Sequence, residues 1–199
     1  SEVIMYVVIA AGLSALVLAL TMDSFLLPFI FLLSIGMAIV YNLGTNFIAG
    51  EISFVTQALA AVLQLAVTMD YSIFLWHSYL ENQERYPDDK KRAMSHAISQ
   101  TLTSVVGSSI TTIAGFLAMC FMTFTLGMDL GIVMAKGVVF GVVGCVTILP
   151  AMILAMDKWI EKTRHKAIIP DLGRIGGFVT KHYWIFIILF LVIIGPAFY

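Results

Sequence analysis

Six long apolar runs determine what this chain can fold into. They cover residues 3–20, 25–41, 54–79, 102–124, 126–155 and 183–199. A helix of about 20 apolar residues crosses the roughly 30 Å hydrocarbon core of a bilayer, whereas barrel strands are shorter segments of alternating hydrophobicity. Hydrophobic residues make up 60% of the chain and charged residues 12%, unlike a soluble domain. The sequence therefore predicts an all-α integral membrane protein.

Basic residues predict how the chain is oriented. Segments 81–100 and 157–182 are rich in Lys and Arg, whereas the connectors at 42–53 and near Thr125 have neither residue. The positive-inside rule then places segments 81–100 and 157–182 in the cytoplasm of a multi-pass protein of the cell membrane. The formal net charge is −1, and the basic residues indicate topology rather than nucleic-acid binding.

The connectors predict local structure. Residues 21–24, "TMDS", form a turn so short that the first two spans are antiparallel neighbours. Segment 81–100 is predicted to be a helix-turn segment interrupted by Pro87. A short amphipathic helix on the inner membrane surface is predicted from apolar residues at helical spacing, namely Ile168, Leu172, Ile175 and Val179.

Small residues are concentrated in the fourth and fifth spans. Gly107, Thr111 and Gly115 recur every fourth residue, and the glycine pairs 127/131 and 137/141 have GxxxG spacing. Such residues let membrane helices approach each other closely. Pro150 predicts a kink in the fifth span. Cys120 and Cys145 are interpreted as small apolar residues without a disulfide.

Several classes of function lack their motifs. The sequence has no GxxxxGK[ST] nucleotide loop, no Ser/His/Asp nucleophile arrangement and no Cys/His cluster. Methionines 119, 122 and 128 lie near one helix end without partner His or paired Cys residues, so a metal site is not expected. We therefore expect neither an enzyme nor a bound cofactor.

Asp70 lies well inside the third apolar run, in "LAVTMDYSIFLWHSYLE" at 65–81. An ionised carboxylate there costs at least ~2.5 kcal/mol on insertion scales. Such a group must be paired, hydrated or protonated, and a carboxylate that changes its protonation state in the membrane can carry protons. Asp70 is therefore the main candidate for a functional site.

Several residues are candidates to support Asp70. Tyr71 follows it directly and so points about 100° away around the helix, which suits contact with a different helix. In the fourth span, Ser108, Ser109 and Thr112 are expected at a similar depth, and each hydroxyl is explained almost as well by packing. His77 lies two turns further along, and it is either a proton relay or an interfacial structural residue.

Lys136 is the only Lys or Arg inside the six apolar runs. A salt bridge to Asp70 is one option for this cation. By the estimated span boundaries, however, Lys136 lies nearer the outer surface by roughly 10 Å. It can instead extend outward to the interface or reach Asp129 on its own helix.

The third span carries the residues of a family resemblance. "MDYSIFL" at 69–75 resembles the Asp-Tyr signature of the MMPL family (mycobacterial membrane protein large) in the resistance-nodulation-division (RND) superfamily. "GEISFVTQ" at 50–57, "SSITTIAGFLAM" at 108–119 and "TILPAMIL" at 147–154 agree with it in family order. Thr68 departs from the pattern, since glycine is common there, and Ser78 stands where that helix usually carries an arginine.

This resemblance implies an architecture. Each half of such a transporter is one helix, a large extracytoplasmic porter domain and five more helices. Residues 1–156 would then be the five-helix bundle of the first repeat, a half-bundle similar to RND and sterol-sensing domains. Residues 157–182 would form a cytoplasmic linker with the interfacial helix, and residues 183–199 the first helix of the second repeat. The expected partners are the rest of that second half and the porter domains of the same transporter.

The resemblance also implies a function. Asp70 and Tyr71 would occupy proton-relay positions in a proton-motive-force-driven exporter of lipids or other hydrophobic molecules. Protons would be the coupling ion, and membrane lipids and the hydrophobic substrate would be the binding partners. The alternative is a lipid-binding or scaffold module without transport, like a sterol-sensing domain. An accessory motor for protein export agrees less well with the motifs.

Overall fold

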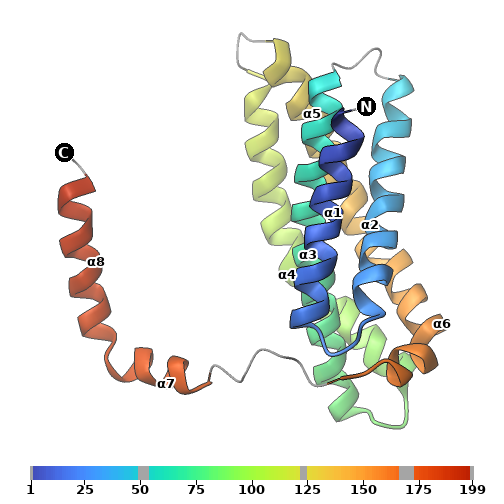
Figure 1. Cartoon of the computed structure of the whole chain (residues 1–199), viewed down its shortest axis with the longest axis vertical. Coiled ribbons are helices and arrows are strands. Elements are labelled where there is room, and N and C mark those ends of the chain that lie inside the picture. Colours follow the sequence, from blue (N-terminus) through green and yellow to red (C-terminus); the bar gives the residue numbers. More distant parts are fainter. Residues whose placement is uncertain (1, 49–53, 122–124, 166–172, 198–199) are drawn as a thin grey trace. The chain divides into compact units, whose positions relative to one another are not determined.

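The computed structural model describes residues 2–48, 54–121, 125–165 and 173–197, and it divides into two compact units, Ser1–Lys166 and Ala167–Tyr199 (Figure 1). All the regular elements in these ranges are helices. Those of the first unit are α1 (Glu2–Thr21), α2 (Leu27–Gly44), the 3-10 helix η1 (Thr45–Ile48), α3 (Phe54–Arg85), α4 (Lys90–Met119), α5 (Thr125–Val146) and α6 (Ile148–Lys162). Those of the second unit are α7 (Gly173–Lys181) and α8 (Tyr183–Ala197). The expected all-α membrane class is confirmed.

Four stretches of helix within the described residues are long and apolar enough to cross a membrane. They are Leu27–Gly44, Phe54–Arg85, Lys90–Met119 and Gly127–Lys162, and Met5–Thr21 and Tyr183–Ile194 are shorter apolar helices. The division of the chain into three parts at residues 156 and 182 stays a prediction.

Helix α4 begins about three turns before the span predicted at 102–124. Its first residue is Lys90, and the preceding Asp89 caps it by accepting a hydrogen bond from the backbone N–H of Arg92 at 2.9 Å. Helix α3 ends at Arg85, so Pro87 lies in the turn between two long helices. The predicted helix-turn segment is therefore confirmed, with helix on both sides of the turn.

The predicted kink in the fifth span is a break between two helices. Helix α5 ends at Val146 and α6 begins at Ile148, two residues before Pro150. Proline has no backbone N–H, so Pro150 cannot bond to the carbonyl of Val146 four residues earlier. The chain changes from α5 to α6 where that hydrogen bond is lost.

The core of the first unit is apolar and draws on all six of its α-helices. Phe31 and Ile35 of α2, Leu75 of α3, and Leu149 and Ile153 of α6 are completely buried. Lipid tails are as apolar as these side chains, so packing rather than removal from water stabilises the bundle within the membrane. Close fit is therefore more important here than buried apolar area.

Polar contacts stabilise one end of the bundle, which carries the α1–α2 turn, the α3–α4 turn and the end of α6 and which we call the turn end (Figure 1). The carboxylate of Asp23 accepts hydrogen bonds from the indole N–H of Trp76 at 3.1 Å and from the Nε of Arg164 at 3.2 Å. The hydroxyls of Ser24 and Thr163 lie 2.7 Å apart. These contacts fix the short α1–α2 turn against α3 and the end of α6.

A second contact at the turn end gives a testable prediction. The Lys90 ammonium bonds to Asp157 at 2.5 Å and to Glu161 at 2.6 Å, which joins the start of α4 to α6. Lys90→Gln leaves two like charges four residues apart on α6, and the Asp157 side chain is only 17% exposed. We expect a loss of about 1 kcal/mol in unfolding free energy, and less at high salt.

Arg85→Gln is the matched control. Arg85 pairs with Glu81 at 2.7 Å, but both side chains are about 60% exposed. Loss of this pair should change stability by no more than roughly 0.5 kcal/mol. Denaturant unfolding of the complete protein at low and high salt measures the stability of both variants. Equal small losses of stability would contradict a stabilising role for the contact of Lys90 with α6.

The second unit contains the predicted short helix before the last span. Helix α7 covers Gly173–Lys181, and the rings of Phe178 and Phe186 meet edge to face at 6.3 Å between α7 and α8. Ile168 and Leu172 of the predicted amphipathic pattern lie outside the described residues. The interfacial position of this helix stays a prediction.

Candidate functional site

Asp70 lies on an exposed face of α3 within the first unit. The residues at helical spacing around it, Leu63, Ala66, Phe74 and His77, are exposed on the same face, whereas Leu65, Thr68 and Ser72 on the other side are buried. None of the described residues of this unit covers the carboxylate. An acid in a membrane helix is thus presented outward and not buried in the core.

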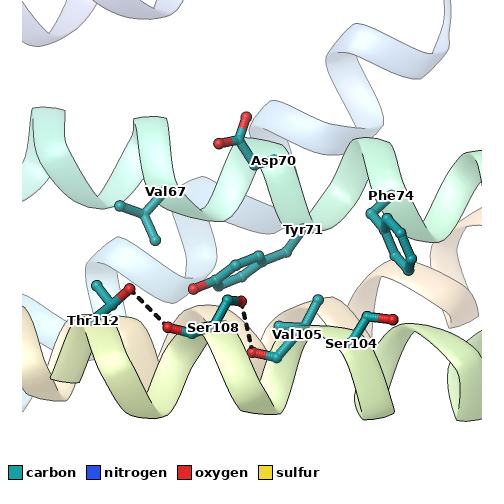
Figure 2. Close-up of a pocket in the computed structure, with 8 residues that line it drawn as sticks. All are labelled: Val67, Asp70, Tyr71, Phe74, Ser104, Val105, Ser108 and Thr112. Atoms are coloured by element: carbon teal, nitrogen blue, oxygen red, sulfur yellow. Dashed lines mark hydrogen bonds between the residues drawn. The ribbon is translucent and has the colours of Figure 1, made fainter. Parts of the chain in front are cut away.

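A groove between α3 and α4 adjoins Asp70 (Figure 2). It has a volume of about 370 Å³. Its lining consists of Val67, Asp70, Tyr71 and Phe74 from α3 and Ser104, Val105, Ser108 and Thr112 from α4. One wall is therefore largely apolar with a single acid, and the other carries three hydroxyls.

Tyr71 points from α3 toward α4, away from the carboxylate of Asp70 (Figure 2). Its side chain is buried, and its hydroxyl accepts a hydrogen bond from the Ser109 Oγ at 3.0 Å. The step of about 100° between adjacent helical residues explains the two directions. The Tyr71 O–H hydrogen is not used in this contact, so it can be donated to another group.

The other two predicted α4 hydroxyls bond to their own helix. Ser108 donates to the carbonyl of Val105 at 3.0 Å, and Thr112 donates to the carbonyl of Ser108 at 2.9 Å (Figure 2). No donor or cation among the described residues bonds to the Asp70 carboxylate. The hydroxyls can still accept hydrogen bonds from groups in the groove.

Helix α4 buries only one narrow stripe. Only 11% of its apolar span is buried, compared with 50% for α3. The bare side is rich in small residues, namely Thr103, Ser104, Gly107, Ser108, Thr111, Ala114, Gly115 and Ala118. A Cβ added at Gly107 or Gly115 would have no neighbour within 4 Å. This side of α4 is therefore open to close approach by another helix.

Lys136 and His77 are placed away from the carboxylate's groove. The Lys136 ammonium bonds to the amide oxygen of Asn46, so the structure brings it neither to Asp70 nor to Asp129. The His77 Nδ1 lies 3.0 Å from the carbonyl of Ile73 on its own helix. His77 shares the exposed face of α3 with Asp70, in the predicted position two turns away.

The sequence interpretation missed the amides inside the bundle. Asn42 and Gln64 are buried and hydrogen bond to each other at 2.7 Å, joining α2 to α3. The available signal was that Gln64 lies within an apolar run and Asn42 directly follows one, because polar side chains in such places hydrogen bond across helices. The Asp23 contacts were also missed, because they join residues more than 50 positions apart.

The site can exchange a proton or receive a partner. A carboxylate without a neighbouring cation can bind a proton from water, and it can also accept a hydrogen bond from a side chain docked on the α3/α4 face. The described residues provide no grouping of His, Cys, Asp and Glu that could hold a metal ion.

Comparison with known proteins places the chain in a family. The model of the MMPL family matches residues 1–189. Among curated relatives, "Putative membrane protein ActII-3" of Streptomyces coelicolor is 31% identical over 64% of this chain and 18% of its own length. "Putative membrane protein MJ1562" of Methanocaldococcus jannaschii is 36% identical over 49% of this chain and 25% of its own length.

The match covers only a part of these larger proteins. "Putative membrane protein SCO0839" of Streptomyces coelicolor is 29% identical over 71% of this chain and 21% of its own length. The chain thus spans between 18% and 25% of the length of these curated relatives. No solved structure matches it. The chain is embedded in a membrane and belongs to the MMPL family, a family of membrane transporters.

Proposed function

We propose that the first unit is the proton-relay module of a proton-motive-force-driven RND-type exporter. The observation that supports this most strongly is the position of Asp70, whose carboxylate lies uncovered on the α3 face beside the hydroxyl-lined groove. Tyr71 is the second relay residue. Protons are the coupling ion, and the module uses no other cofactor.

The bare face of α3 and α4 supports a partner in the same transporter. Leaving an ionised carboxylate against lipid is costly, and small residues such as Gly107 and Gly115 permit a helix to pack closely. The second half of the transporter, with its own relay residues, is the proposed occupant of this face. The porter domains complete that transporter.

The relay proposal assigns a role to each neighbouring group. Asp70 binds and releases the proton, and the Tyr71 hydroxyl, held by Ser109, donates its free hydrogen toward the facing half. Ser108 and Thr112 accept hydrogen bonds from water in the groove. His77 supports exchange at the end of α3 nearer segment 81–100, which we place in the cytoplasm with segment 157–182.

Energetics allow such a relay to drive movement. A membrane potential supplies ~2.3 kcal/mol per charge per 100 mV, and one pH unit adds about 1.4 kcal/mol. Protonation removes the charge that makes Asp70 unfavourable in hydrocarbon, and so changes how tightly the α3 face can pack against another helix. Proton binding can therefore be coupled to movement between the two halves of a cell-membrane transporter.

The substrate class is proposed from a second groove that Asp70 also lines. It has a volume of about 550 Å³ and lies between α1 and α3. Its other lining residues are almost all apolar: Ala10, Leu13, Ser14, Val62, Leu65, Ala66, Val67 and Met69. A lipid or another hydrophobic molecule suits such walls.

Flux in proteoliposomes that contain the complete transporter tests the function. A fluorescent phospholipid should be exported when a pH gradient is imposed and should stop moving when a protonophore collapses that gradient. Export at an unchanged rate without the gradient would contradict proton coupling. Lipid binding that is independent of pH, with no flux under either condition, would favour the sterol-sensing-like alternative.

A further inference from the structure

A second polar cluster lies inside the bundle, on the side of α3 that faces away from the Asp70 surface. Its members are Asn42 of α2, Asn46 of η1, and Gln64 and Thr68 of α3. Their exposed fractions are 0%, 7%, 1% and 3%. Four polar side chains are thus at least nine-tenths buried within the apolar bundle.

The hydrogen bonds fix which way the amides point. The Asn42 Nδ2 donates to the Gln64 Oε1 at 2.7 Å and to the backbone carbonyl of Val133 at 3.2 Å. A carbonyl only accepts, so this nitrogen must be the donor and the Gln64 oxygen must be the acceptor. The Lys136 ammonium only donates, so Asn46 must present its oxygen to Lys136.

These orientations leave four buried polar atoms without a partner among the described residues. They are the Asn42 Oδ1, the Gln64 Nε2, the Asn46 Nδ2 and the Thr68 Oγ1. A buried polar group that has lost water and gained no partner destabilises the folded state. Hydrocarbon offers no alternative partner within a membrane, so a ligand that satisfies these atoms would stabilise the bundle.

We propose that this cluster is a binding site for ordered water. The unmet atoms include two amide donors, an amide acceptor and a hydroxyl, and water can both donate to and accept from such a set. A metal cation would use only the acceptors and would be repelled by Lys136. An anion would use only the donors and would face the Asn42 oxygen.

Two glycines of helix α5 lie directly against the polar cluster. A Cβ at Gly137 would lie 2.7 Å from the Asn42 Nδ2 and 2.9 Å from the Gln64 Oε1. A Cβ at Gly141, one turn along, would lie 2.5 Å from the Thr68 Oγ1. The polar groups therefore follow a line along α5, and half-buried Lys136 connects that line to the surface.

The site is separate from the Asp70 relay and does not depend on it. Bound water would make the junction of α2, α3 and α5 a hydrated seam, with hydrogen bonds that can exchange partners as the helices move. The neighbouring core is apolar by contrast, since Cys145 of α5 is 1% exposed and belongs to the apolar cluster.

Radiolytic footprinting of the complete transporter tests the proposal, with water as the probe. Two variants of the transporter, Thr68→Cys and Ala61→Cys, are each exposed to short X-ray pulses in ¹⁸O-water. Oxidation of the introduced cysteine is measured by mass spectrometry. Ala61 is 4% exposed and lies in the apolar cluster of the same helix. We expect the cysteine at position 68 to be oxidised roughly tenfold faster, because bound water produces radicals beside it.

Cys145 provides an internal reference in each protein and should stay as slow as position 61. Equal oxidation rates at positions 61 and 68 would overturn the proposal. Gln64→Cys is a second reporter in case Thr68→Cys does not fold, and folding of each variant is checked by size-exclusion chromatography. A slow rate at position 64 would likewise overturn the water site.

Discussion

Replacing Asp70 with asparagine is expected to reduce gradient-driven flux by the complete transporter to the protein-free background. Asparagine has nearly the same shape as aspartate, but its side-chain amide does not bind and release a proton near neutral pH. The Asp70 side chain is exposed in the first unit, and no described residue bonds to it. The fold should therefore tolerate the change, because the variant removes a charge that is costly in hydrocarbon.

The measurement combines flux, proton uptake and thermal unfolding of the same preparations. Asp70→Asn should retain the unfolding temperature of the unmodified protein while losing both flux and proton uptake. Asp129→Asn is the matched control, because it removes another acid from an apolar span but lies on α5 and does not line the groove. Flux that follows the gradient in Asp70→Asn would disprove the role of Asp70, whatever the control shows.

The angle between the Asp70 and Tyr71 side chains was predictable because it depends only on helical geometry, whereas the outward direction of Asp70 was not predicted. Adjacent residues differ by about 100°, and the structure accordingly places Tyr71 against Ser109 of α4 while Asp70 faces outward. The position of His77 follows from the same periodicity. Local geometry therefore settles which residues share a face of the helix, while tertiary packing decides which face is exposed.

Partners from distant parts of the chain were not predictable in this way. Lys136 bonds to Asn46, 90 positions away in η1. The span boundaries estimated from hydropathy give the depth of Lys136 in the membrane, but they do not tell which neighbouring helix its side chain can reach. The length of α4 was also underestimated, because hydropathy marks the part of a helix that suits lipid. Residues 90–101, which precede the predicted span, contain many polar side chains yet are helical, and the Asp89 cap indicates where the helix begins.

The glycine pair at 137 and 141 was expected to permit close helix approach, and it gives the second large prediction. Gly141→Ala should destabilise the complete protein by about 1–3 kcal/mol through overpacking. The added Cβ would meet the Thr68 Oγ1 at 2.5 Å. Relief of this contact requires either a change of the Thr68 χ1 rotamer, of which threonine has two in a helix, or a shift of α5 away from α3. Denaturant unfolding measures the loss.

Gly36→Ala is the control, because a Cβ there has no neighbour within 4 Å. It should be neutral or stabilise α2 by up to roughly 1 kcal/mol, as alanine favours helix over glycine. Equal effects of Gly36→Ala and Gly141→Ala would show that backbone preference, not the contact with Thr68, decides the outcome.

A double variant identifies the atoms responsible. In Gly141→Ala with Thr68→Ala, the atoms beyond the Cβ of residue 68 are removed, and the nearest remaining atom named there, that Cβ, lies 3.5 Å from the added methyl. This is an ordinary van der Waals contact, so most of the lost stability should return. Failure of Thr68→Ala to restore stability would mean that the two helix backbones, rather than these side chains, are already in contact.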